Sequence, residues 1–209
     1  MKALAKILSV SVLVSGSLLT SSVVSADVSY NVGFVTEYYY RGIYQKNASA
    51  SAGVDYEQNG FYAGAWTADV GDGLEIDGYL GFGGEVGDFT YGAGFTGYYY
   101  TGGFDETYEE VNLSAGYGPL SIGYSIGEWD GGGGTDYDFL QVSMDLGAGF
   151  YGLYGSFGDE VDGDYFEVGY GTTVGEIDLG VALIFPSDEL EGTNNAAGEA
   201  ITLSIGKSL

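Results

Sequence analysis

The sequence predicts an all-β fold, a transmembrane antiparallel up-and-down β-barrel of about twelve strands with short periplasmic turns and long acidic extracellular loops. Three observations lead to this prediction. Apolar residues alternate with small or polar ones, the breaks between these segments alternate in length, and no stretch after residue 26 has the ~18 consecutive apolar residues of a membrane-spanning helix. An exported chain without such a helix can still enter a membrane as a closed barrel, which pairs its backbone polar groups internally.

The alternation is clearest from Leu120 to Ile126, where every even residue is apolar or aromatic and every odd one is small or polar. Because successive side chains of a strand point to opposite faces, such a segment has one apolar and one polar face. The same period of two predicts strands over residues 28–40, 74–82, 89–99, 166–174, 177–185 and 201–205. A soluble acidic β-sandwich would show the same alternation. The lengths of the breaks between the strands distinguish the two folds.

The breaks between the strands form two classes that alternate along the chain. The tight breaks are residues 58–60, 86–88, 118–119, 147–149 and 174–176. The longer breaks are residues 41–47, 68–73, 101–107, 127–136, 158–164 and 186–199. Short turns at one end and long loops at the other are typical of an outer-membrane barrel, and a sandwich has no reason to sort its connections in this way.

Residues 1–26 have the pattern of a cleavable secretory signal peptide. Lys2 and Lys6 form a short basic region, an apolar stretch broken by serines follows, and small residues precede a cleavage site after Ala26. The apolar stretch is too short to act as a membrane anchor. We therefore expect residues 27–209 to form the mature barrel, in the outer membrane of a Gram-negative bacterium.

Composition narrows the range of functions. The chain has 30 acidic and 5 basic residues, and Lys2 and Lys6 leave with the signal. Nucleic acid is therefore excluded as a partner, because it binds basic surfaces. The absence of histidine removes the general base of a serine triad and the commonest zinc ligand. We expect no catalytic residue, no cofactor site and no metal site.

Two groups of carboxylates have an alternative interpretation. Glu75 and Asp77 have the residue types of a glycosidase pair, but two carboxylates on one strand face are also the pattern of a wetted face. The loops carry Glu128, Asp130, Asp136, Asp138, Asp159, Glu160, Asp162 and Asp164. Such oxygens can bind Ca²⁺, yet no stretch has EF-hand spacing. A solvated acidic surface is the preferred interpretation, and divalent-cation binding by the loops stays open.

Aromatic residues are expected to form two girdles at the membrane interfaces, where an apolar ring with a polar edge is favoured. The girdle near the long loops comprises Tyr38, Tyr40, Trp66, Tyr99, Tyr100, Trp129, Tyr137 and Phe185. The girdle near the short turns comprises Tyr30, Tyr56, Phe61, Phe89, Tyr117 and Phe150. Many of the 39 glycines fall at inward strand positions, where we expect them to leave the lumen less filled.

The inward register carries the candidate functional residues. They are Glu37, Arg41, Asp55, Glu57, Glu75, Asp77, Glu85, Glu110, Gln141, Asp145, Glu167 and Asp178. Carboxylates without bases to pair them require water, and a barrel of about twelve strands is wide enough to hold it. We predict a narrow passive diffusion channel for small cations or small polar solutes, with weak cation preference. The alternative is a closed, non-conducting barrel with a structural or surface-interaction role through its acidic loops. The expected partner is outer-membrane lipid, and the sequence leaves the oligomeric state open.

Residues 31–45 resemble the opening motif of the TorF family of porins, formerly catalogued as a conserved hypothetical proteobacterial outer-membrane family. The chain keeps Asn31, Gly33, Tyr38, Arg41, Gly42 and Gln45 of this motif. Residues 60–66, 75–79 and 83–85 are similar as well, whereas Thr36-Glu37 replaces Ser-Asp and Tyr44 replaces Ser. The resemblance implies an outer-membrane barrel and a porin function, and it implies no particular solute.

Overall fold

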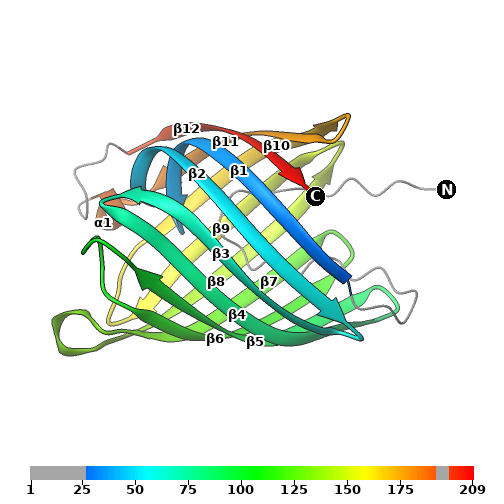
Figure 1. The fold of residues 1–209 in the computed structure, drawn as a ribbon. Helices are drawn as coiled ribbons and strands as arrows, with labels where there is room; N and C mark the ends of the chain where they lie inside the picture. The colour runs from blue at the N-terminus through cyan, green and yellow to red at the C-terminus, as the bar shows by residue number, and fades with distance from the viewer. Residues whose placement is uncertain (1–26, 192–197) are drawn as a thin grey trace.

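The computed structural model describes residues 27–191 and 198–209, so the predicted signal peptide, residues 1–26, lies outside the described residues. The described chain forms one closed barrel of twelve antiparallel strands (Figure 1), as the sequence predicts. The strands are β1 (Asp27–Tyr40), β2 (Ile43–Gln58), β3 (Phe61–Gly71), β4 (Gly73–Val86), β5 (Phe89–Tyr100), β6 (Tyr108–Tyr117), β7 (Leu120–Trp129), β8 (Thr135–Gly147), β9 (Phe150–Asp159), β10 (Asp164–Val174), β11 (Ile177–Pro186) and β12 (Ala200–Ser208). Two short helices, η1 (Gly131–Gly133) and α1 (Asp188–Glu191), lie in connections. In the part of the chain that the structure describes, no helix is long and apolar enough to cross a membrane.

The barrel closes where the first strand meets the last. Every strand pairs with its neighbours in the sequence, and β1 pairs antiparallel with β12. This closing register places Asn31 opposite Ser208 and Val35 opposite Ser204. Beyond it, the backbones of Tyr30 and Leu209 exchange hydrogen bonds of 2.8 and 3.2 Å. Closure leaves no strand edge unpaired, which is what a lipid environment requires of a sheet.

The connections at the two ends of the barrel differ in length. At one end, here called the turn end, five hairpins have two-residue turns, such as Asn59-Gly60, where both φ angles are positive at 52° and 83°. This geometry fits the type I′ turn that matches the strand twist. At the other end, the loop end, residues 101–107, 130–134, 160–163 and 187–199 form the longer connections.

Two predicted loops are wrong in length. Only Arg41 and Gly42 separate β1 from β2, and only Asp72 separates β3 from β4. The predicted breaks 41–47 and 68–73 are instead mostly strand, because the β1–β2 ladder continues to the pair Tyr40 and Ile43 and the β3–β4 ladder to the pair Gly71 and Gly73. Polar residues at the rim of a barrel still pair through their backbones, so side-chain polarity alone did not mark the end of these strands.

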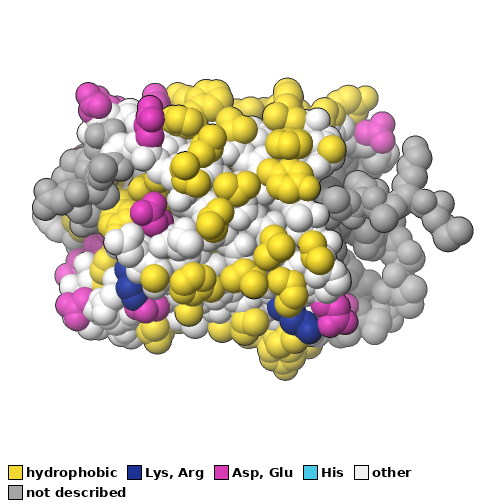
Figure 2. Space-filling view, turned by 90° about the horizontal axis from the view of Figure 1, so that it is seen from above, with side chains coloured by type: hydrophobic (Ala, Val, Ile, Leu, Met, Phe, Trp, Pro, Cys, Tyr) yellow, Lys and Arg dark blue, Asp and Glu magenta, His cyan; other side chains and the backbone are white. Residues whose placement is uncertain are grey.

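The outer face is apolar around the middle of the barrel, and acidic side chains gather toward its ends (Figure 2). The exposed aliphatic side chains include Val32, Leu80, Ile122, Leu179 and Leu203. The predicted turn-end girdle also faces outward: Tyr30, Phe89, Tyr117 and Phe150 are exposed, and the rings of Tyr56, Phe61 and Phe82 pack in a row. A surface of this kind suits a hydrocarbon layer bordered by an interface.

The predicted loop-end girdle is largely wrong, because most of its rings point into the barrel. Tyr99 and Phe185 are exposed on the outer face, as predicted. Tyr38 instead packs against Trp66, with 6.1 Å between ring centroids, and its hydroxyl reaches an inward carboxylate. The other inward members are Tyr40, Tyr100, Trp129 and Tyr137, which contact further rings inside the barrel. A ring of twelve strands encloses more space than backbone fills, and these aromatic side chains occupy it at the loop end.

Several inward glycines do not leave the lumen open, contrary to the prediction. A Cβ atom on Gly64 would lie 2.5 Å from the ring of Tyr79, and one on Gly169 would collide with the ring of Tyr151. In both cases a tyrosine of the neighbouring strand lies flat over the glycine. These glycines therefore make room for rings against the barrel wall rather than widening the passage.

Candidate functional site

The twelve residues predicted to line the lumen divide into two groups by burial. Arg41, Glu75, Asp77, Glu110, Gln141 and Glu167 are buried in the loop-end half of the interior. Glu37, Asp55, Glu57, Glu85, Asp145 and Asp178 are half-buried or exposed. All of them except Arg41 lie on strands, and Arg41 lies in the two-residue turn after β1 with a positive φ of 49°. The inward-facing residues therefore have two environments, one buried and one accessible to water, whereas the sequence predicts a single hydrated face.

Arg41 and Glu110 form the centre of the buried group. The guanidinium of Arg41 donates two hydrogen bonds to the carboxylate of Glu110, at 3.0 Å from Nη1 and 2.8 Å from Nη2. Its Nη2 also donates to the hydroxyl of Ser125 at 3.2 Å, and its Cζ lies 4.3 Å from the ring centre of Phe139. A two-pronged ion pair of this kind is strong and directional. It ties the β1–β2 turn to β6, β7 and β8 across the interior.

Tyrosine hydroxyls complete the coordination of Glu110. Tyr98 on β5 donates to Oε1 at 2.8 Å, and Tyr137 on β8 donates to Oε2 at 3.0 Å. The carboxylate therefore accepts two bonds from the guanidinium and two from phenols. A buried charge needs such partners, since desolvation costs several kcal/mol per ion. This assembly of Arg41, Glu110, Tyr98, Tyr137 and Ser125, called the constriction network below, narrows the interior near the loop end.

The carboxylates of Glu75 and Asp77 on β4 have far fewer hydrogen-bond partners than that of Glu110. Tyr38 donates to Oε1 of Glu75 at 2.7 Å. Oε2 of Glu75 and both carboxylate oxygens of Asp77 are buried and accept no hydrogen bond from the described residues. Tyr98 lies opposite Asp77 in the register but gives its hydroxyl to Glu110. Asp77 is thus a buried acid without compensation, which is costly in its charged form.

Replacing Asp77→Asn is expected to raise the free energy of unfolding by roughly 1–4 kcal/mol, because the parent must bury an unpartnered carboxyl either charged or at the cost of protonating it, whereas an amide of the same volume is neutral. Urea titration of the refolded barrel in detergent micelles measures this change. Asp162→Asn, in an exposed loop, is the control and should stay within about 0.5 kcal/mol of the parent. An Asp77→Asn barrel no more stable than the parent contradicts a destabilising, unpartnered carboxyl at Asp77.

The turn-end half of the interior is more exposed to solvent. Glu85 and Asp145 are exposed there, and Asp178 accepts a hydrogen bond from Thr173 at 2.6 Å. A Cβ atom on Gly171 would meet only one backbone oxygen, at 3.9 Å. Small side chains also line this half, among them Ser51, Ser114 and Ser121. Water can therefore enter the barrel from the turn end and hydrate these carboxylates.

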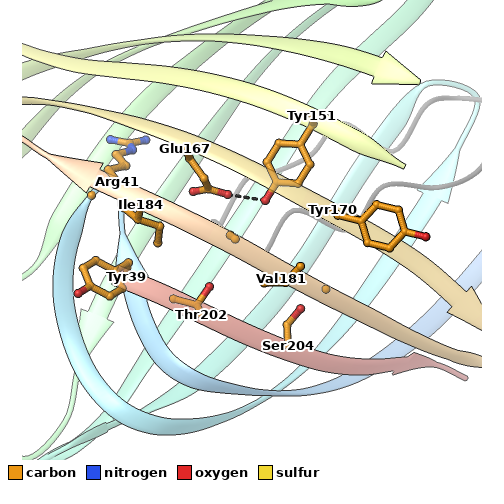
Figure 3. Close-up of a pocket in the computed structure, with 12 residues that line it drawn as sticks. Tyr39, Arg41, Tyr151, Glu167, Tyr170, Val181, Ile184, Thr202 and Ser204 are labelled. Carbon is orange, nitrogen blue, oxygen red and sulfur yellow. Dashed lines mark hydrogen bonds between the residues drawn. The ribbon is translucent and has the colours of Figure 1, made fainter. Parts of the chain in front are cut away.

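A small cavity lies between the two halves, beside the constriction network. Figure 3 shows it between β1, β9, β10, β11 and β12, with the Tyr151 hydroxyl donating to the carboxylate of Glu167. That hydrogen bond is 2.5 Å long. The hydroxyl-bearing side chains of Thr202 and Ser204 project from β12 toward the same space (Figure 3). The cavity is thus a polar recess with one carboxylate in its wall.

Sequence reasoning missed the aromatic and hydroxyl partners of the lumen. Tyr137, Tyr151 and Ser125 bind the buried charges, yet the predicted set holds only charged or amide residues. The inward position of Tyr98 follows from alternation with Thr96 and Gly94, but its hydrogen bond to Glu110 does not. Within residues 27–191 and 198–209, no three acidic side chains come close enough together to hold a metal ion.

Comparisons with solved structures return outer-membrane proteins of limited similarity. The chain is similar to Pseudomonas aeruginosa OccK2 (OpdF), crystallised in complex with glucuronate, at 17% identity and a TM-score of 0.43, over 78% of this chain and 59% of that one. It is similar to Pseudomonas aeruginosa OpdK with vanillate at 18% identity and a TM-score of 0.40, over 79% and 57%. The BenF-like porin of Pseudomonas fluorescens Pf-5 has 15% identity and a TM-score of 0.40, over 84% and 59%.

The chain therefore spans less than two thirds of the length of these structures. Similarity at this level does not carry a solute or an activity from those proteins to this one. No curated protein sequence matches the chain. A family model does match, over residues 20–182, and it is described as a bacterial protein of unknown function. That match covers most of the barrel, from before β1 into β11, and the chain belongs to the Gcw_chp family.

Proposed function

We propose that this protein is an outer-membrane porin, a narrow passive diffusion channel for small solutes with a weak preference for cations. The predicted signal peptide, residues 1–26, directs its export, and residues 27–209 form the barrel in the bacterial outer membrane. The TorF porin likeness of residues 31–45 belongs to this proposal, since the family description names no function. The role is transport, and no side chain is assigned to catalysis.

The observation that carries the proposal is the contrast between the two faces of the closed barrel. The outer face is apolar, whereas the inward face carries carboxylates at every level from the turn end to the loop end. Among the predicted lumen residues, Arg41 is the one cation, and Glu110 already neutralises it. A barrel with this excess of inward carboxylates attracts cations and repels anions.

The constriction network sets the size of what can pass. Residues from the β1–β2 turn, β5, β6, β7 and β8 meet there through hydrogen bonds of 2.8–3.2 Å. Passage therefore requires side-chain motion in this network, and the expected conductance is low. The turn-end half, whose carboxylates are more exposed, acts as an acidic vestibule.

A closed, non-conducting barrel is the second candidate, and burial favours it. Glu75, Asp77 and Glu110 are only 0, 1 and 2% exposed. A permanently water-filled passage along these side chains would leave more of their surface accessible. In this candidate the exposed acidic loops carry the function, through contacts at the cell surface.

A planar bilayer experiment separates the two candidates. The mature protein, refolded and inserted, is expected to give small discrete conductance steps with a reversal potential that favours K⁺ over Cl⁻. Neutralising the vestibule through Asp55→Asn, Glu85→Gln and Asp145→Asn together should reduce that preference, because the charges that attract cations are lost. The loop triple Glu106→Gln, Asp162→Asn and Asp188→Asn is the control and should change the preference less. Folded, inserted protein without conductance would reject the porin and leave the closed barrel.

A further inference from the structure

We propose that the cavity beside Glu167 is a binding site for one water-sized monovalent cation, such as ammonium or an alkali-metal ion of similar radius. The inference deepens the proposed channel function by naming its solute class, and it rests on that function for the role of the site in passage. Binding itself depends only on the cavity and is tested separately below.

Two strands place the carboxylate at the cavity wall. Glu167 on β10 is buried, and its Oε1 accepts the hydrogen bond from Tyr151 on β9 at 2.5 Å. Tyr151 reaches it because its ring lies over Gly169, where any side chain would collide with the ring. The glycine therefore fixes the phenol, and the phenol fixes the carboxylate. A carboxylate held in this way is a preorganised ligand for a cation.

The opposite wall supplies neutral oxygens. Thr202 and Ser204 on β12 lie two residues apart on the inward face, and both line the cavity. Neither hydroxyl has a side-chain hydrogen bond to another described residue, so both keep their acceptor capacity. Tyr39 on β1 adds an aromatic wall at the loop side (Figure 3). Hydroxyl oxygens and aromatic rings facing a carboxylate are the surroundings in which a small cation is bound.

Size and charge select the class of ligand. The free space holds about one water-sized group, which excludes sugars, aromatic acids and other larger solutes. Arg41 also reaches the cavity, but its guanidinium is held by Glu110 in two hydrogen bonds, so its charge is already matched. One carboxylate among neutral oxygens suits a single positive charge, whereas Ca²⁺ takes six to eight oxygens, commonly several carboxylates.

The position of the cavity links the two halves of the interior. Ser204 pairs with Val35 on β1 and with Gly180 on β11, one level closer to the turn end than Thr202. Arg41 and Tyr39 mark the loop side. A cation that enters through the acidic vestibule meets this site immediately before the constriction network. The site thus provides a binding position for a dehydrated cation along the channel.

Equilibrium binding of radioactive rubidium to the mature protein, refolded in detergent, tests the proposal. Ionic strength is held constant with N-methylglucamine, which is too large for the cavity. We expect saturable binding of about one Rb⁺ per chain, displaced by ammonium and potassium. Glu167→Gln should weaken it by at least about tenfold, roughly 1.4 kcal/mol. Asp164→Asn, on the same strand but exposed, should bind as the parent does.

A second variant guards against a folding defect in Glu167→Gln. Thr202→Val replaces a cavity hydroxyl by a methyl group of the same shape, and it should also weaken Rb⁺ binding while the barrel stays folded by its circular dichroism. Non-saturable binding, or equal binding by the parent and both cavity variants, would overturn the cation site. Saturable Rb⁺ binding by a barrel that shows no conductance would reject the porin and leave the site. Conductance without Rb⁺ binding would reject the cation site and leave the porin.

Discussion

Replacing Arg41→Met is expected to destabilise the barrel by about 3–5 kcal/mol, because it leaves the buried carboxylate of Glu110 without its counter-charge. Arg41 makes two hydrogen bonds to Glu110 and one to Ser125, and both partners are inside the barrel. Methionine keeps most of the length of the side chain and its packing on Phe139. The loss should therefore come from the charge, and urea titration in detergent micelles measures it.

The double variant Arg41→Met/Glu110→Gln identifies the origin of that loss. Removing both charges should recover most of the stability, because the glutamine keeps an acceptor for Tyr98 or Tyr137 and has no charge to neutralise. Lys46→Met is the control, since Lys46 pairs with Asp69 at a more exposed position and should cost no more than about 1 kcal/mol. A loss for Arg41→Met no larger than that for Lys46→Met contradicts a structural role for the constriction network.

Replacing Tyr98→Ala is expected to enlarge the passage and raise single-channel conductance, while destabilising the barrel by roughly 3–5 kcal/mol. The ring of Tyr98 is only 2% exposed and packs edge-on against Tyr40 and Tyr108, with centroid distances of 5.5 and 6.4 Å. Its removal leaves a hole in the constriction network, beside Asp77 and Glu110. Bilayer recordings of refolded protein measure the conductance, and urea titration measures the stability.

The next residue along β5 provides the matched control. Tyr99 is 44% exposed on the outer face, and its hydroxyl reaches only Glu109 at 3.4 Å. Tyr99→Ala should leave the conductance unchanged and cost much less stability, because it opens no space inside the barrel. Equal conductance changes for the two variants would mean that Tyr98 does not bound the passage, and the constriction would then have to be placed elsewhere.

The sequence predicted the architecture well because a barrel imposes a local rule on every strand. The alternation from Leu120 to Ile126 corresponds to β7, and the predicted strands over 28–40, 89–99 and 177–185 correspond to β1, β5 and β11. All five tight breaks are two-residue turns in the structure. A period of two and a pair of turn residues are each set within a few positions, so no distant contact is needed to recognise them.

The interior could be predicted only in part. Alternation alone predicts that the side chains of Glu75, Asp77, Glu110 and Glu167 face inward, and in the structure they do. Alternation cannot say how an inward side chain is surrounded, because its neighbours come from strands far apart in the sequence. Arg41 meets Glu110 across 69 residues, and that pairing depends on how the barrel closes.

The aromatic residues show the same division. Tyr30 and Tyr117 near the turn end face outward as predicted, whereas Tyr38 and Tyr137 near the loop end turn inward against the prediction. A tyrosine suits a membrane interface and a polar lumen equally well, since its ring is apolar and its hydroxyl binds water or a carboxylate. Local composition therefore does not decide between the two positions.

The sequence by itself determined a closed antiparallel barrel with an apolar outer face and an acidic inner one, because side-chain alternation and turn chemistry are local properties of the chain. Only the tertiary structure decided which carboxylates are buried, which are hydrated, and which tyrosines fill the loop-end half. These outcomes depend on strand closure and stagger, which set the space inside the barrel and the partners that meet within it.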